Sequence, residues 1–364
     1  MAEKNLDFDT VIDRTHTNSL KYDFAVQRGK PKGVLPLWVA DMDFQVSSYI
    51  QEALSGSVTH GIFGYSEVDG SYFEAVAGWM RRHYGWNVEE PWLVKTPGIV
   101  FALAQAVRAF TEPGDAVLLQ QPVYYPFSQV IRDNGRKIVD NTLVQGEDGR
   151  YRIDFADFVE KIRNCKVKLF FLCNPHNPVG RVWTKEELLR LGDICEKYGV
   201  IVVSDEIHAD FVFEGSHQVL AGLKESYRKF VVTCTAPSKT FNLAGLQVSN
   251  IFISDDALRR KFEQAVAASG YSQLNTMGLV ACEAAYRHGE EWYDAVKAYI
   301  RENLAYAQHF LEEQIPQVKA VKPEGTYLLW VDFRSLGLSR KELEDLIVKK
   351  AGLWLDSGDI FGAA

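Results

Sequence analysis

The chain has 364 residues, of which 47% are hydrophobic and 24% charged, a balance typical of a folded globular protein. Its formal net charge of -8 at pH 7 gives no general attraction to nucleic acid or anionic membranes, so neither is an expected partner. The five cysteines form no CxxC pair, which predicts free thiols in a reducing cytoplasm and no zinc site. No apolar run is long enough for a membrane span, and the start of the chain lacks the apolar core of a signal peptide.

Residues 1–45 are predicted to be an irregular N-terminal arm or a segment of a small domain. The arm ends in an apolar stretch flanked by acids, residues 37–44, which we expect to pack on another domain or subunit or to form one wall of a pocket. Helices are predicted over 46–59 and from Ser71 onward, with Ser71 as the N-cap of the second. Glycines make the intervening loop around Tyr65 tightly turned or mobile.

A further helix is predicted over 99–110, directly after a short strand. The first N–H groups of a helix have no partner within the helix and lie at the positive end of its dipole. Gly98, Ile99 and Val100 therefore form a candidate anion site. Taken alone, an ordinary capped helix explains the same residues.

Buried apolar strands alternate with helices through the middle of the chain, which predicts a mainly parallel sheet covered on both faces, an α/β fold. These strands are predicted over 116–120, 168–173, 199–204 and 229–234. Ligands of such sheets bind outside the carboxyl ends of the strands, so the polar and aromatic residues that follow each strand should converge. These residues are Tyr124, Asn177, Asp205, His208, Ser238 and Lys239.

Lys239 comes directly after the end of a buried strand. The ordinary interpretation of this position is a surface lysine in a strand-to-loop turn. A desolvated amine has a lowered pKa and can form a Schiff base with an aldehyde, so Lys239 is a candidate anchor for pyridoxal 5′-phosphate (PLP). PLP also needs a carboxylate, an aromatic wall and a phosphate site. The candidates are Asp205 for the ring nitrogen, Tyr124 for stacking, Asn177 and His208 for the ring oxygen, and Gly98, Ile99, Val100 and Ser238 for the phosphate.

Two other chemistries fit these residues less well. Asp205, Glu206 and His208 resemble a set of metal ligands, but adjacent residues at a strand end point in opposite directions, so no metal is expected. A serine hydrolase of the α/β class carries a GxSxG turn at its nucleophile, and the sequence has no such turn.

Near residue 285 the buried strands give way to long helices and shorter strands. This change predicts a large domain over 46–284 and a small α+β domain over 285–364. The expected strands of the small domain are 318–321, 325–332 and 353–355, around a helix over 339–350.

Seven stretches together resemble the fold type I PLP enzymes of the aspartate aminotransferase superfamily, over nearly the whole chain. They are ADMDF (40–44), FGYS (63–66), PVYYPF (122–127), NPHNPVGRVW (174–183), SDEIHAD (204–210), APSKTFNLAG (236–245) and EGTYLLWVDF (324–333). Within the superfamily they most resemble the branch of cystathionine β-lyases and cystalysin-like C–S lyases. The resemblance implies an aspartate-aminotransferase-like fold with a large PLP-binding domain and a small α+β domain.

The resemblance also implies a homodimer with active sites at the subunit interface. Tyr65 of one subunit would reach the PLP phosphate of the other, and Lys239 would be the Schiff-base lysine. Backbone groups of Val39 and Ala40 would help to bind a small amino-acid substrate. We expect Tyr327 to shape the same pocket.

The implied reaction is α,β-elimination from cystathionine or another cysteine S-conjugate, which gives pyruvate, ammonia and a thiol. Lys239 would remove the Cα proton. An aminotransferase is the main alternative, because both reactions use the same residues, and a PLP-bearing regulatory protein is a further one. The resemblance implies an Arg for the substrate α-carboxylate after the motif at 360–362. No Arg of this sequence matches that role, so the residue is expected beyond Ala364, or carboxylate binding is impaired.

Overall fold

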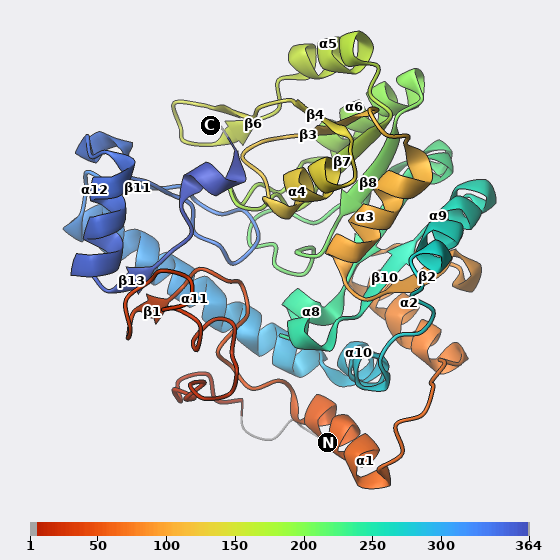
Figure 1. Ribbon diagram of the computed structural model, residues 1–364, viewed down its shortest axis with the longest axis horizontal. Helices are drawn as coiled ribbons and strands as arrows, with labels where there is room; N and C mark the ends of the chain where they lie inside the picture. The colour runs from red at the N-terminus through yellow and green to blue at the C-terminus, as the bar shows by residue number, and fades with distance from the viewer. Residues whose placement is uncertain (1–5, 363–364) are drawn as a thin grey trace.

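The computed structural model describes residues 6–362. Figure 1 shows a central sheet with helices on both faces, and a smaller lobe in which the last part of the chain lies beside the N-terminal arm. This α/β architecture confirms the predicted fold class.

The central sheet has seven strands in the order β2-β10-β9-β8-β7-β3-β4. The strands are β2 (Leu93–Thr96), β3 (Ala116–Leu119), β4 (Lys137–Asp140), β7 (Leu169–Cys173), β8 (Ile201–Asp205), β9 (Val231–Thr235) and β10 (Ser249–Phe252). Strands β4, β3, β7, β8 and β9 pair in parallel, whereas β10 runs antiparallel to both β9 and β2. Strand β2 therefore runs in the same direction as the five parallel strands, and its carboxyl end lies at the same edge of the sheet as theirs.

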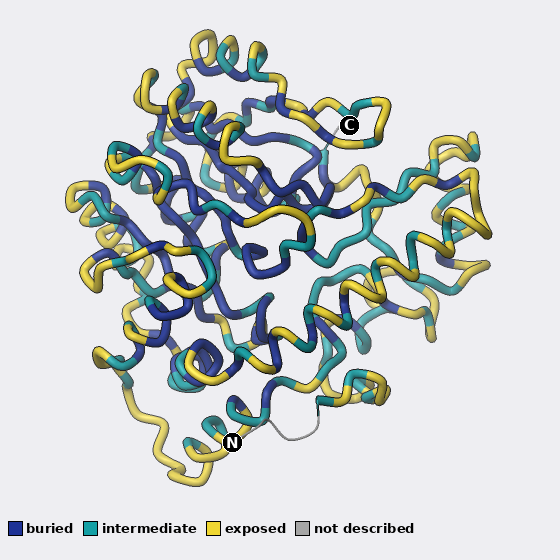
Figure 2. The backbone as a smooth tube through the Cα atoms, turned by 180° about the vertical axis from the view of Figure 1, so that it is seen from behind, coloured by how far each residue is buried: buried dark blue, intermediate teal, exposed yellow. Residues whose placement is uncertain are grey.

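The central strands are buried on both faces, as their unbroken apolar sequences predict; every residue of β7 and β9 is buried. Because side chains alternate along a strand, each strand contributes to two cores, and Figure 2 shows the buried backbone at the centre of the molecule. One core contains Val203 and is covered by α3 (Ile99–Phe110), α4 (Pro126–Asp133) and α9 (Asp256–Ala268). The other contains Phe170 and is covered by α2 (Gly70–Tyr84), α5 (Phe155–Cys165), α6 (Lys185–Tyr198) and α10 (Thr276–His288).

The first two helices form near their predicted positions. Helix α1 spans Ser48–His60 and begins after Ser47, whose side chain accepts a hydrogen bond from the N–H of Tyr49. The predicted cap of α2 is wrong: the helix begins at Gly70, and Asp69 caps it by accepting a hydrogen bond from the Ser71 N–H at 2.8 Å. An Asp at this position satisfies a free N–H and also places a negative charge at the positive end of the helix.

The smaller lobe joins the two ends of the chain. Strand β1 (Leu35–Pro36) pairs in parallel with β13 (Leu353–Trp354), and the rings of Trp38 and Trp354 stack with centroids 4.6 Å apart. Helix α11 (Glu290–Gln314) runs from the large core, where Trp292 is buried, toward this lobe (Figure 1). The division into 1–45, 46–284 and 285–364 stays a prediction; residue 285 lies inside α10.

The strand predicted over 325–332 is mostly wrong, since only β12 (Val331–Asp332) forms there, paired with β11 (Lys319–Ala320). Thr326 has a φ of 64°, which turns the backbone away from an extended course. The N–H groups of Gly325 and Thr326 donate to the carbonyls of Gly180 and Phe211, so this segment is bound to the connections that follow β7 and β8.

The remaining elements are short. They are the strands β5 (Val144–Gln145) and β6 (Tyr151–Arg152), the helices α7 (Leu220–Leu223), α8 (Pro237–Thr240) and α12 (Arg340–Glu344), a π-helical turn at Asp345–Lys350, and 3-10 turns at Glu90–Trp92, Glu225–Lys229, Ala244–Leu246, Arg334–Leu336 and Gly358–Phe361. Within residues 6–362, every helix is too short or too polar to cross a bilayer. All five cysteines are free, and four of them are buried.

Candidate active site

The strand register brings the predicted residues to one edge of the sheet. Asp205, the last residue of β8, lies opposite Cys234 of β9 on one side and Cys173 of β7 on the other. Asn177 follows β7 by four residues, and Lys239 follows β9 by four residues on the short helix α8. The predicted convergence is therefore found in the fold.

The amine of Lys239 is directed at the N-terminal arm. Its Nζ donates a hydrogen bond to the carbonyl oxygen of Ala40 at 2.9 Å, and the hydroxyl of Tyr327 donates to the same oxygen at 2.9 Å. Burial lowers the pKa of Lys239 to about 8, although the nearby carboxylates of Asp41 and Asp205 oppose that shift. A substantial fraction of the amine is therefore neutral, and nucleophilic or basic, close to physiological pH.

Asp205 is a buried carboxylate with few donors. Burial raises its pKa to about 7, with a smaller contribution from the neighbouring charge of Glu206, while the Ile207 N–H donates to Oδ1 at 3.1 Å. Glu206 points elsewhere, since its oxygens accept from Ser204 at 2.8 Å and bind His217 at 2.7 Å. A cationic group placed opposite Asp205 would restore the ionised carboxylate, so this position favours a positively charged ligand atom.

Among the predicted site residues, two buried polar atoms have no hydrogen-bond partner within the described part of the chain. They are Nδ1 of His208 and Oδ1 of Asn177. The ring of His208 packs edge-on against Tyr327 with centroids 5.7 Å apart, and burial lowers the pKa of His208 to about 3, so the imidazole is neutral. A buried polar atom without a protein partner needs an explanation, and at this edge of the sheet a bound ligand would supply the partner.

Tyr124 forms an aromatic wall beside these groups. Its N–H donates to the carbonyl of Asn177 at 3.0 Å, and the ring packs partly buried on the α3 side of the sheet. Burial raises the pKa of the Tyr124 hydroxyl, and Tyr125 and Asp205 add to that effect. The phenol is therefore neutral, and its ring can present an apolar face to a ligand.

The predicted anion site lies at the start of α3. Gly98 has a φ of 101°, and no side chain caps this helix end. Ile99 is buried, whereas Val100 remains 41% exposed, so the first turn of the helix opens outward. Ser238, the other predicted phosphate residue, is half-buried and directly precedes Lys239 on α8. These groups suit an anion.

The single chain does not bring Tyr65 to this edge. Tyr65 lies in the segment between α1 and α2, and its side chain is 96% exposed. Val39 and Ala40, the predicted substrate residues of the arm, are half-buried beside the lysine, as the Ala40 hydrogen bond requires.

Asn242 is a residue of the site whose role the sequence did not reveal. Its side chain accepts from the Met42 N–H at 2.9 Å and donates to the carbonyls of Met42 at 2.9 Å and Phe44 at 3.1 Å. These bonds hold the arm against the turn that follows Lys239. The motif that contains Asn242 drew attention to this turn, but its partners 200 residues away cannot be read from local sequence.

Two arginines near the site are already engaged. Arg181 is buried and binds Glu187 and Glu324, each at 3.0 Å. Arg14 binds Asp41 and Asp43 of the arm. Both guanidinium groups are therefore held by carboxylates of the protein itself.

The family model "Aminotransferase class I and II" matches residues 34–364. The chain belongs to this family. The resemblance inferred from the sequence motifs is thereby confirmed.

Individual relatives match over almost the full chain. Cystathionine beta-lyase PatB of Bacillus subtilis (strain 168) is 45% identical over 358 residues, covering 98% of this chain and 92% of that protein. A PLP-bound protein of Clostridium difficile 630, provisionally named an aminotransferase, has a TM-score of 0.96 at 40% identity and covers 98% of this chain and 92% of its own. Cystalysin from Treponema denticola, which contains PLP, has a TM-score of 0.94 at 37% identity, with coverage of 98% and 91%.

Proposed function

We propose that this chain is a PLP-dependent C–S β-lyase, which cleaves cystathionine or another cysteine S-conjugate to pyruvate, ammonia and a thiol. The observation that carries the proposal is the Lys239 amine, whose pKa burial lowers to about 8, at the same sheet edge as Asp205. The 45% identity to a cystathionine beta-lyase over 98% of the chain supports the choice of reaction.

The residues present fit PLP. Lys239 would anchor its aldehyde, and the cationic ring nitrogen would pair with the buried carboxylate of Asp205, whose raised pKa it would lower again. The unpartnered atoms of Asn177 and His208 suit the ring oxygen, and Tyr124 would cover the ring face. The uncapped start of α3 and the Ser238 hydroxyl suit the phosphate.

When bound, PLP withdraws electrons from the substrate Cα and makes its proton acidic. Lys239 Nζ then serves as the general base that takes this proton, since its lowered pKa keeps part of the amine neutral near pH 7. The carbonyl of Ala40, which also accepts a hydrogen bond from the Tyr327 hydroxyl, defines the direction in which the amine points. The proton then held on Nζ is available to the thiolate that leaves from Cβ.

The test is to incubate the purified protein with cystathionine and PLP and to measure pyruvate and free thiol. We expect both products, and their loss in Lys239→Ala, with unchanged circular dichroism. An oxo acid formed only with an added amino-group acceptor would instead support an aminotransferase, the alternative favoured by the Clostridium difficile neighbour. Normal PLP binding without turnover of any amino acid would favour a regulatory protein.

We further propose a cytoplasmic homodimer in which Tyr65 completes the partner's phosphate site. The 96% exposure of Tyr65, next to exposed Ile62 and Phe63, supports an interface at this loop. Mixing Lys239→Ala with Tyr65→Ala subunits would test it, since each hybrid dimer contains one intact site. Equal mixing should restore about a quarter of wild-type activity, as expected for random pairing in a two-fold dimer. No recovery after verified subunit exchange would contradict a shared site.

A further inference from the structure

Asp210 is a buried carboxylate on the connection that follows β8, outside the residues assigned to PLP above. It is 7% exposed, and three neutral groups donate to its side chain. The indole N–H of Trp79 donates to Oδ1 at 3.0 Å, the hydroxyl of Tyr84 donates to Oδ1, and the hydroxyl of Thr240 donates to Oδ2. A buried carboxylate bonded on both oxygens is held in one orientation.

Thr240 is the residue directly after Lys239, and both belong to α8. This helix has only four residues and no side-chain bond at its N-cap. So short a helix has no stability of its own, and its orientation depends on contacts with its surroundings. The bond from Thr240 to Asp210 fixes the last residue of α8, one position from the reactive amine.

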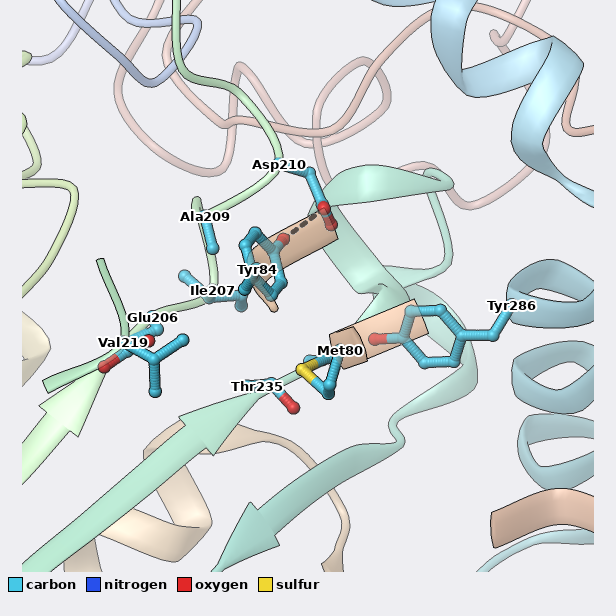
Figure 3. Close-up of a pocket in the computed structure, with 10 residues that line it drawn as sticks. Met80, Tyr84, Glu206, Ile207, Ala209, Asp210, Val219, Thr235 and Tyr286 are labelled. Atoms are coloured by element: carbon cyan, nitrogen blue, oxygen red, sulfur yellow. Dashed lines mark hydrogen bonds between the residues drawn. The ribbon is translucent and has the colours of Figure 1, made fainter. Parts of the chain in front are cut away.

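Asp210 is in turn fixed by two long helices. Trp79 and Tyr84 belong to α2, and the hydroxyl of Tyr293 on α11 donates to the Asp210 carbonyl at 2.6 Å. Figure 3 shows the Tyr84 hydroxyl directed at the Asp210 carboxylate beside a small cavity that Thr235 also lines. The cluster of Asp210, Tyr84 and Trp79 thus joins the end of α8 to the rigid part of the large domain.

We propose that Asp210 is a positioning residue that acts through Thr240 to aim the Lys239 amine. The proposal rests on the role of Lys239 in the proposed function. Loss of the Thr240–Asp210 bond frees α8 to rotate and moves Nζ from its place beside the Ala40 carbonyl. A shift of about 1 Å in a reacting group can cost about a hundredfold in rate, so even a small rotation is measurable.

The test compares Thr240→Val, which removes the hydroxyl at similar volume, with Thr240→Ser, which retains it. For the PLP-loaded enzyme with cystathionine, we expect Thr240→Val to lower kcat about tenfold or more at nearly constant KM. Thr240→Ser should stay within about threefold of wild type. A second measurement needs no substrate: apoprotein is mixed with PLP, the bond to Lys239 is trapped with borohydride at timed intervals, and the labelled peptide is quantified. The trapping rate should fall in Thr240→Val and recover in Thr240→Ser.

Asp210→Asn and the double variant with Thr240→Val complete the cycle. An Asn side chain cannot satisfy all three donors, because its Nδ2 is itself a donor. If Asp210 acts through Thr240, the double variant should be no slower than Asp210→Asn alone, a strongly non-additive result. If Asp210→Asn does not fold, the Val and Ser pair at 240 decides the question.

Tyr72→Phe is the control for a loss of stability alone. Tyr72 is another buried residue of α2, and its hydroxyl donates to Asn250 at 2.8 Å and not to Asp210. It should lower the melting temperature without changing the trapping rate. Thr240→Val with wild-type kcat and trapping rate would overturn the proposal, as would a double variant whose losses multiply. Wild-type protein that traps PLP on Lys239 but makes no pyruvate would instead contradict only the proposed function.

Discussion

Replacing Asp205 with Asn tests the electrostatic state of the site most directly. The substitution keeps the shape of the side chain and removes its charge. In the ligand-free protein, burial raises the pKa of Asp205 from 3.8 to about 7. Between these two pH values the unfolded chain has lost a proton that the folded protein still holds, so a rise in pH favours unfolding.

The size of the effect follows from the pKa difference. A difference of about three in pKa, at 1.36 kcal/mol each, corresponds to about 4 kcal/mol. We therefore expect this side chain to make the ligand-free wild type less stable as the pH rises from about 4 to about 7, with the loss complete above that range. Asp205→Asn should not show this part of the decrease, and near pH 8 its ligand-free form should be the more stable protein by up to about 4 kcal/mol. With PLP the order should reverse, because the ring cation pairs with Asp205 but not with Asn.

The assay is urea unfolding followed by circular dichroism across this pH range, with and without PLP. Asp133→Asn is the matched control, because Asp133 is an exposed carboxylate at the end of α4. The control should follow the wild-type pH dependence. The reasoning would be refuted if ligand-free Asp205→Asn and wild type changed in parallel with pH.

Other predictions follow from single contacts. Asn242→Ala removes three hydrogen bonds to Met42 and Phe44 and places Ala at a φ of 57°. The free energy of unfolding, measured by urea unfolding, should therefore fall by about 3 kcal/mol. Phe170 is fully buried in the core, so Phe170→Ala should lower the free energy of unfolding by about 3–5 kcal/mol. A urea midpoint equal to that of the wild type would contradict the packing described. The rate at which Lys239 is acylated in the apoprotein should rise about tenfold per pH unit and level off near its pKa of about 8. The acylation rate of exposed lysines should continue to rise toward pH 10. If Lys239 followed the same pH dependence as the exposed lysines, it would be an ordinary surface amine.

The sequence predicts the sheet and its ligand-binding edge well, because both depend on local patterns. Buried strands such as 169–173 are recognisable from unbroken apolar runs, and the residues after them must meet where parallel strands end. The prediction of a strand over 325–332 was mostly wrong because the backbone there is hydrogen-bonded to distant loops at Gly180 and Phe211. The periodicity of the local sequence does not encode such contacts. The role of Asp210 escaped prediction for the same reason, since the donors to its carboxylate come from α2 and α8, two distant parts of the chain.

The shared carbonyl of Ala40 also sets the order in which the protein can become functional. Its two donors, Lys239 and Tyr327, lie 199 and 287 residues further along the chain. During synthesis the arm is made before Lys239 and Tyr327, so its hydrogen bonds to them can form only after most of the chain has been made. Contacts between residues so far apart in the sequence also form slowly. We therefore expect the hydrogen bond between the Lys239 amine and the Ala40 carbonyl to form late in folding. Capture of PLP by Lys239 should then appear only in the last phase of refolding, after the sheet has formed.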